Sequence, residues 1–100
     1  MTDKQFTDAF TAAGGWFILT QYEMIADWKG EISALVDELY KKGFDKSRIG
    51  TSTRVSSTIR LINNNRGKEA LEKIMYSDKI NAKHPEAKKL AEGILKRRFA

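Results

Sequence analysis

Apolar residues recur every three or four positions through the middle of the chain, a spacing typical of a helix with one buried face. The run is strongest between Ile25 and Tyr40, inside a helix expected over about 20–42. Its apolar stripe comprises Ile25, Trp28, Ile32, Leu35, Val36 and Leu39. No other segment offers as much, so we expect the other helices to pack around it. Gly30 lies inside the run and costs about 1 kcal/mol relative to alanine, which predicts a kink or a split there.

The same periodicity predicts further helices on both sides of this segment. They are expected over about 3–13, 51–64, 68–77 and 85–98. Glycine and asparagine tolerate the left-handed backbone that a helix exit needs, and they supply the breaks at Gly14-Gly15, at Gly43 and within 63–67. The pattern therefore predicts an all-α fold: one domain over 1–100, built as a compact bundle of five or six helices around a central amphipathic helix.

The expected boundaries follow from individual residues. Thr51 or Ser52 can cap the helix over 51–64, because a hydroxyl accepts from a free backbone N–H of the first turn. Pro85 suits the first turn of the last helix, where its missing donor costs nothing. We expect residues 44–50 to connect two helices and residues 78–84 to form a polar connection before the last one.

A short apolar run, Trp16 to Leu19, follows the double glycine, and its periodicity does not distinguish strand, turn or helix start. We interpret it as the lead-in to the central helix. Phe6, Phe10 and Trp16 are expected to pack on the core of their own chain, because a 100-residue domain has few other large groups to bury. The alternative is an exposed Trp16-Phe17 pair at a self-association surface.

Composition argues against catalysis and against resident cofactors. The chain has no cysteine and a single histidine, His84, so the nitrogen and sulfur ligands that zinc or iron needs are lacking. No glycine-rich phosphate-binding motif occurs. Asp37 and Glu38 are adjacent and point to different sides of a helix, so they do not form a working carboxylate pair. We expect a protein that is not an enzyme, with no cofactor and no metal.

The absence of cysteine also fits a reducing compartment, and we expect a cytoplasmic location. The longest unbroken apolar run, Trp16 to Leu19, is far too short to cross a bilayer, so no membrane partner is expected. Residues 2–11 are polar and carry acids, unlike a signal peptide.

Charge divides the chain into two unlike parts. The net charge is +5, but residues 1–40 hold two lysines against seven acids, whereas residues 41–100 hold sixteen basic residues against six acids. A basic surface can simply keep a small protein in solution. Concentration of the positive charge in the second part also suits contact with an anion, most often nucleic acid.

Within the basic part, residues 48–67 form the strongest functional candidate. Arginines occur there every six residues with no acid between them, and small hydroxyl residues lie in the gaps. Arginine binds phosphate through two parallel hydrogen bonds, and serine, threonine and asparagine bond to phosphates and base edges. The predicted nucleic-acid-binding residues are Arg48, Thr53, Arg54, Ser56, Ser57, Arg60, Asn64 and Arg66, with Lys96, Arg97 and Arg98 from the last helix.

The same segment also reads as an ordinary solvated helix. Six-residue spacing turns successive arginines by about 240°, so the four do not form one row, and only Arg60 lies squarely on the polar face. Arg48 and Arg66 are expected in flanking loops. Neither pair of neighbouring helices makes a convincing helix-turn-helix, because one connection is too long and the other leads into a helix with two glutamates.

The sequence thus favours a non-catalytic nucleic-acid-binding helical module that contacts DNA or RNA through residues 48–67 and the C-terminal helix. The alternative is a module that binds another protein or itself, through the acidic N-terminal part or the Trp16-Phe17 region. Salt dependence separates the two hypotheses, since phosphate binding weakens steeply with salt and an apolar interface does not. No motif among these residues identifies a family.

Overall fold

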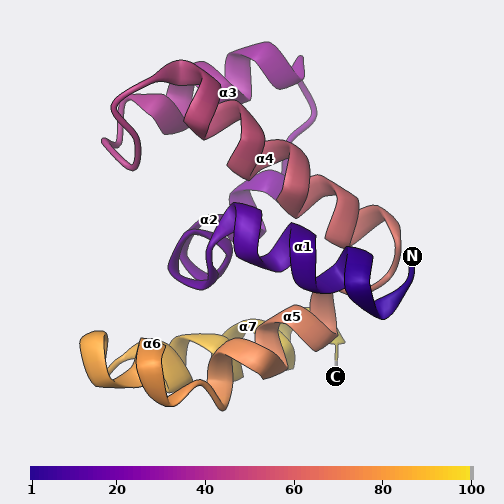
Figure 1. Cartoon of the computed structure of the whole chain (residues 1–100), viewed down its shortest axis with the longest axis vertical. Helices are drawn as coiled ribbons and strands as arrows, with labels where there is room; N and C mark the ends of the chain where they lie inside the picture. Colours follow the sequence, from indigo (N-terminus) through magenta and orange to yellow (C-terminus); the bar gives the residue numbers. More distant parts are fainter. Residues whose placement is uncertain (100) are drawn as a thin grey trace.

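The computed structural model describes residues 1–99, and within them every regular element is a helix (Figure 1). The helices are α1 (Asp3–Ala13), α2 (Gly15–Asp27), α3 (Ile32–Tyr40), α4 (Arg48–Asn63), α5 (Gly67–Met75), α6 (Asp78–Lys83) and α7 (Ala87–Phe99). The predicted all-α class is confirmed. The predicted number was too low, because the described residues form seven helices and not five or six.

The first correction concerns the central helix, which is two helices. The segment expected over 20–42 is interrupted after Asp27, and Trp28 adopts extended backbone angles, φ −67° and ψ 130°. The Trp28 indole then donates to the backbone carbonyl of Glu31 at 2.9 Å, which bridges the break. Gly30 lies within this bridged turn, where it avoids the cost of a glycine inside a helix.

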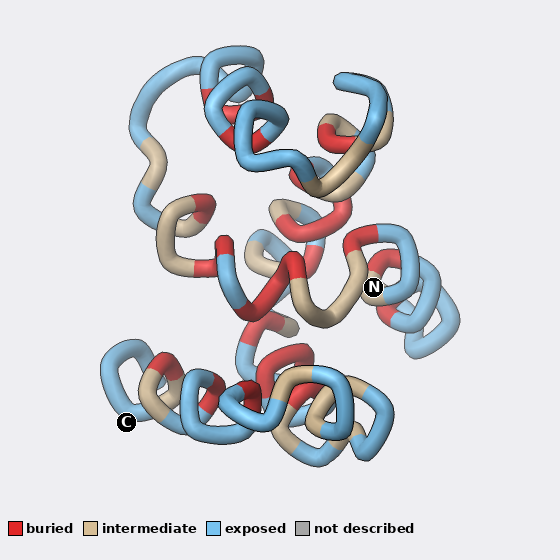
Figure 2. Tube along the Cα trace, turned by 90° about the vertical axis from the view of Figure 1, so that its left-hand side faces the viewer, coloured by how far each residue is buried: buried red, intermediate tan, exposed pale blue. Residues whose placement is uncertain are grey.

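The helices enclose two clusters of buried side chains, and α2 contributes to both. One cluster joins α1, α2, α4, α5 and α7 through residues such as Ile18, Leu61 and Leu71. The other joins α2, α3 and α4 through Phe17 and Leu35, among others. Accordingly α1 and α2 lie between a layer of α3 and α4 and a layer of α5, α6 and α7 (Figure 1), and buried positions face inward between these layers (Figure 2).

The predicted apolar stripe is buried only in part. Leu35, Val36 and Leu39 are almost fully buried, as expected. We expected Trp28 and Ile32 to be buried together with these three, but Ile32 is 48% exposed and Trp28 is only half-buried against the same cluster. The break at residues 28–31 is the reason, since it changes the direction of the chain between Ile25 and Leu35.

The N-terminal aromatic residues pack as predicted on the core of their own chain. Phe6 is buried, and Phe10 and Trp16 are partly buried against the same cluster. Helix α1 begins with a reciprocal cap: the Gln5 backbone N–H donates to the Thr2 hydroxyl, and the Thr2 backbone N–H donates to the Gln5 side chain. This cap fixes the start of the helix that carries Phe6.

Helix α4 begins three residues earlier than predicted. Ser47, and neither Thr51 nor Ser52, is the cap, and its hydroxyl accepts from the Gly50 N–H at 3.3 Å. Thr51 is buried and its hydroxyl instead donates to Asp45 at 3.1 Å. Arg48 therefore lies in the helix and not in a flanking loop.

Two corrections apply near the C-terminus. The stretch 78–84, expected as a polar connection, contains α6, whose first turn is capped by the Ser77 hydroxyl accepting from the Ile80 N–H at 3.2 Å. The last helix begins at Ala87, just after Pro85, and not at the proline itself. Among residues 1–99, no helix has the length and apolar character needed to span a bilayer.

Candidate functional site

Three of the four arginines in residues 48–67 are held by the chain's own acids and carbonyls. Arg48 donates through Nε to Asp37 at 2.6 Å and through Nη2 to the backbone carbonyl and hydroxyl of Ser33. Arg66 binds both carboxylate oxygens of Glu69, at 2.7 and 2.8 Å. It also reaches Asp3 at 3.0 Å and the carbonyls of the first two residues.

Arg54 joins three segments of the fold. Its Nε lies 3.0 Å from both carboxylate oxygens of Asp45, and its Nη1 donates to the backbone carbonyl of Ala13 at 2.6 Å. The guanidinium carbon lies 5.9 Å from the centre of the Phe17 ring. The remaining nitrogen, Nη2, makes no hydrogen bond to any residue in 1–99.

The arginines of the last helix bind α2. Arg97 donates to Glu23 at 2.7 Å, and Arg98 donates to both oxygens of Asp27 at 2.6 and 3.1 Å. These hydrogen bonds from Arg97 and Arg98 lower the pKa of Glu23 and of Asp27 respectively below their usual ranges. Neighbouring Tyr22 has its pKa raised by burial, which Arg98 partly offsets.

Other members of the predicted set are dispersed along α4. The Thr53 hydroxyl donates to the carbonyl of Ile49, and the Asn64 side-chain amide donates to the carbonyl of Arg60. Both donors are thus already bonded to backbone carbonyls of α4. Ser57 is buried. Three exposed members make no side-chain hydrogen bond or ion pair to residues 1–99: Ser56, Arg60 and Lys96. The chain's own acids hold most of the predicted arginines, at separate junctions between helices.

A different part of the molecule brings aromatic and basic side chains together. A groove of about 750 Å³ opens between the loop after α3, the start of α2 and helix α6. We call it the aromatic-basic groove, and its lining residues are Phe10, Gly14, Gly15, Trp16, Phe17, Phe44, Arg54, Ser77, Lys79, Ile80, Lys83 and His84. Its volume lies in the range of small-ligand sites, about 300–1,000 Å³.

The aromatic part of the groove is built on a stacked pair. The rings of Trp16 and His84 lie 3.7 Å apart between centroids and 5° from parallel. Deeper in, the Phe17 and Phe44 rings meet edge-on at 5.0 Å and 80°. Gly14 has a positive φ of 84°, which lets the chain turn between α1 and α2 and brings Trp16 to the mouth of the groove.

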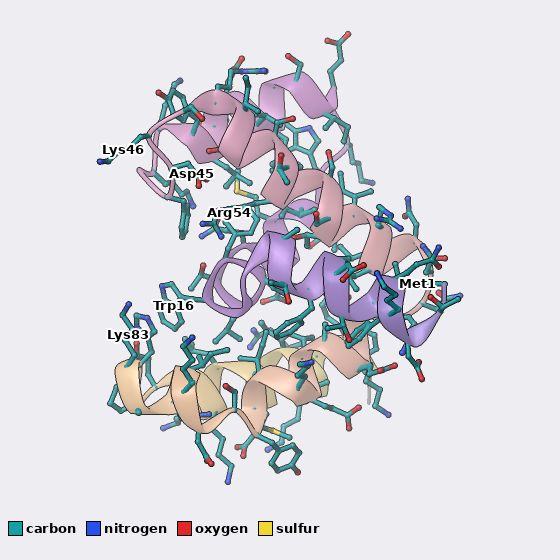
Figure 3. The ribbon with its side chains drawn as sticks, viewed as in Figure 1. Met1, Trp16, Asp45, Lys46, Arg54 and Lys83 are labelled. Atoms are coloured by element: carbon teal, nitrogen blue, oxygen red, sulfur yellow. The ribbon has the colours of Figure 1, made fainter. Side chains whose placement is uncertain are left out.

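The basic part of the groove comes mainly from α6. Lys79 and Lys83 are four residues apart, so they project from one face of the helix. Both are exposed, and no carboxylate of residues 1–99 lies within ion-pair distance of either. In Figure 3 Lys83 points from α6 toward the opening, with Trp16 beside it and Arg54 on the opposite wall.

Asn81 holds α6 in place. Its side-chain amide donates to the carbonyls of Ile74, Met75 and Ser77, the last at 2.7 Å, and its oxygen accepts from the Lys88 N–H at 3.1 Å. One side chain thus joins the end of α5, the start of α6 and the start of α7. The lysine wall of the groove is therefore fixed relative to α5 although α6 has only six residues.

Sequence reasoning missed most of this groove. Residues 78–84 were expected to be a polar connection. His84, next to Pro85, was expected to be a loop or helix-cap residue, and it is the C-cap of α6. The available signal was Lys79 and Lys83 at helical spacing, after a capping serine and without an acid between them. The pairing of Trp16 with His84 had no sequence signal, because 68 positions separate them.

No cluster of three or more metal-binding side chains is found among the residues that the structure describes. No family model matches the chain, and comparisons with curated proteins and with solved structures return no match.

Proposed function

We propose that this chain is a non-catalytic module that binds nucleic acid, and that the aromatic-basic groove is its contact surface. The observation that carries the proposal is the position of Lys79 and Lys83, which have no acidic partner within residues 1–99, beside the Trp16–His84 stack. Positive charge follows a phosphate backbone, and aromatic faces accept bases, so the combination is typical of nucleic-acid-binding surfaces.

The distribution of the other charges favours the groove, and not residues 48–67, as the contact surface. Five of the six arginines are in ion pairs with acids of the same chain. A phosphate would have to compete with those carboxylates, whereas it meets the ammonium groups of Lys79 and Lys83 without such competition. Arg54 is the member of the predicted set that lines the groove, and its unbonded Nη2 adds a donor there.

The test is a salt titration of a labelled single strand and a labelled duplex. The Lys79→Ala/Lys83→Ala variant should bind more weakly at low salt, and the slope of log affinity against log salt should fall by about two. The matched control, Lys29→Ala/Lys68→Ala, removes the same charge from exposed positions outside the groove and should keep the wild-type slope. Absence of binding to either nucleic acid at low salt would overturn the proposal.

Arg60→Ala separates the groove from the α4 surface that the sequence predicted. Arg60 is exposed on α4, away from the groove lining. If Arg60→Ala lowers the slope and the paired lysine variant does not, the contact surface is on α4. If nucleic acid binds and neither variant changes affinity or slope, the contact surface lies elsewhere on the protein. If neither nucleic acid binds at low salt, the protein-interaction alternative is favoured.

A further inference from the structure

We infer that the aromatic-basic groove takes an unpaired nucleotide of a single strand, whose base extends the Trp16–His84 stack while flanking phosphates lie along Lys79 and Lys83. This inference rests on the proposed nucleic-acid function and specifies its ligand. It assigns a distinct role to the aromatic side chains, which a purely electrostatic surface would not need.

The geometry of the ring pair is the first argument. Trp16 and His84 are parallel at 3.7 Å, the arrangement that successive bases adopt in a strand. The two rings come from α2 and from the residue after α6, and both are partly buried, so their orientation is fixed before a ligand arrives. A third planar ring added to such a pair loses little freedom on the protein side.

The shape of the groove is the second argument. A cavity of about 750 Å³ lined on several sides accommodates one or two planar groups, whereas a duplex about 20 Å across would contact only its rim. In the interior of a duplex both faces of each base are already stacked and its edge is paired. Aromatic recognition of this kind is therefore available to unpaired bases and not to the interior base pairs of a duplex.

The charge around the stack is the third argument. Lys83 directly precedes His84, and Lys79 lies one helical turn earlier, so positive charge runs away from the ring pair along α6. Figure 3 shows Lys46 on the loop across the opening from Lys83. No carboxylate belongs to the lining residues. Of the nearby acids, Asp45 is held by Arg54 and Thr51, and Glu86 lies 3.9 Å from His84 Nδ1, beside the stack and outside α6. A strand with its base on the stack would thus meet cations where its phosphates lie.

The experiment compares two strands of equal length on the wild-type protein: a thymidine oligonucleotide and its abasic sugar-phosphate counterpart. Stacking predicts that the abasic strand binds about 5- to 100-fold more weakly, whereas phosphate contacts alone predict equal binding. The duplex of the same length should also bind more weakly than the thymidine strand. A uridine strand should bind as the thymidine strand does, since stacking needs no 2′-hydroxyl.

Variants of Trp16 test whether the base-dependent part of the affinity comes from stacking on this ring. Trp16→Leu should lower affinity for the thymidine strand about as much as base removal does, with no further loss on the abasic strand. Trp16→Phe keeps a ring and should retain part of the affinity, which covers the case in which Trp16→Leu unfolds. In a Trp28→Phe background, Trp16 is the sole tryptophan, and its fluorescence should be quenched by the thymidine strand and not by the abasic one.

The outcomes distinguish this inference from the function on which it rests. Equal binding of thymidine and abasic strands, with a salt slope that still depends on Lys79 and Lys83, overturns base stacking and leaves nucleic-acid binding in place. Loss of all binding at low salt overturns both.

Discussion

The Arg98 guanidinium donates to both carboxylate oxygens of Asp27, at 2.6 and 3.1 Å, across 71 positions of sequence. The contact joins the last helix to α2, and Arg97 repeats it one position earlier with Glu23. Acids of residues 1–40 thus bind four of the six arginines, all of which lie in residues 41–100. The charge asymmetry between residues 1–40 and 41–100 therefore serves in part to form ion pairs within the same chain.

This junction predicts a specific pH dependence of stability. The folded-state pKa of both Glu23 and Asp27 is lowered by arginine. Their contribution to the free energy of unfolding is therefore complete above the unfolded-state pKa values, about 4.3 and 3.9, and is lost as pH falls through the lower folded-state values. Denaturation at low ionic strength between about pH 5 and 2 should show the loss, since salt screens such exposed pairs.

The matching variant is Glu23→Gln/Asp27→Asn, whose stability should depend less on pH over that window than the wild-type stability does. Glu31→Gln is the control, because the Glu31 carboxylate makes no ion pair within residues 1–99. If the double variant and the wild type lost stability in parallel, the arginine junction would not be the source of the dependence.

The second core cluster predicts a contrast between two positions of α3. Leu35 is fully buried, so Leu35→Ala should lower the free energy of unfolding by about 2–5 kcal/mol. Ile32→Ala, at a position 48% exposed, should lower it by less than about 1.5 kcal/mol. Chemical denaturation of both variants measures the difference. Equal losses would mean that the chain does not break between α2 and α3 as described.

Gly67, the first residue of α5, is predicted to tolerate no side chain. A methyl group there would overlap the hydroxyl of Tyr22, which is buried. Gly67→Ala should therefore cost about 1–3 kcal/mol of stability, although alanine is the better helix former. Gly30→Ala is the control, because its methyl group would meet only ordinary contacts with the Trp28 ring.

A Tyr22→Phe background tests the cause of that loss. It removes the hydroxyl that the new methyl group would strike, so Gly67→Ala should cost less there than in the wild type. The same cost in both backgrounds would show that the strain lies elsewhere, for example in the ring itself.

Replacing Arg54 is predicted to cost more stability than replacing Arg48, although both residues form ion pairs from α4. The Arg54 pair with Asp45 is partly buried, with side chains 31% and 16% exposed, and Arg54 also binds the Ala13 carbonyl at 2.6 Å. Arg54→Lys breaks the forked geometry and should cost about 1.5–3 kcal/mol. Arg48→Lys, in a more exposed pair, should cost about 1 kcal/mol or less. Thermal denaturation of both variants decides this.

The sequence by itself determined the fold class and most helices. Apolar spacing located α1, α4, α5 and α7 within a few residues, because a helix that buries one face must repeat its apolar positions with the helical period. Local sequence also placed Gly30 as a break in the central segment. It did not reveal α6, since six residues with one half-buried apolar side chain carry too little periodicity.

Only the tertiary structure decided which charges stay available and where a ligand could bind. Periodicity shows the face on which Arg98 lies but not that Asp27 faces it, because ion pairs between distant helices depend on how those helices pack. The same holds for Trp16 and His84, which meet only because α6 folds back beside the start of α2. Residues 48–67 looked basic as a sequence, and folding neutralised most of that charge, leaving the lysines of α6 beside an aromatic stack.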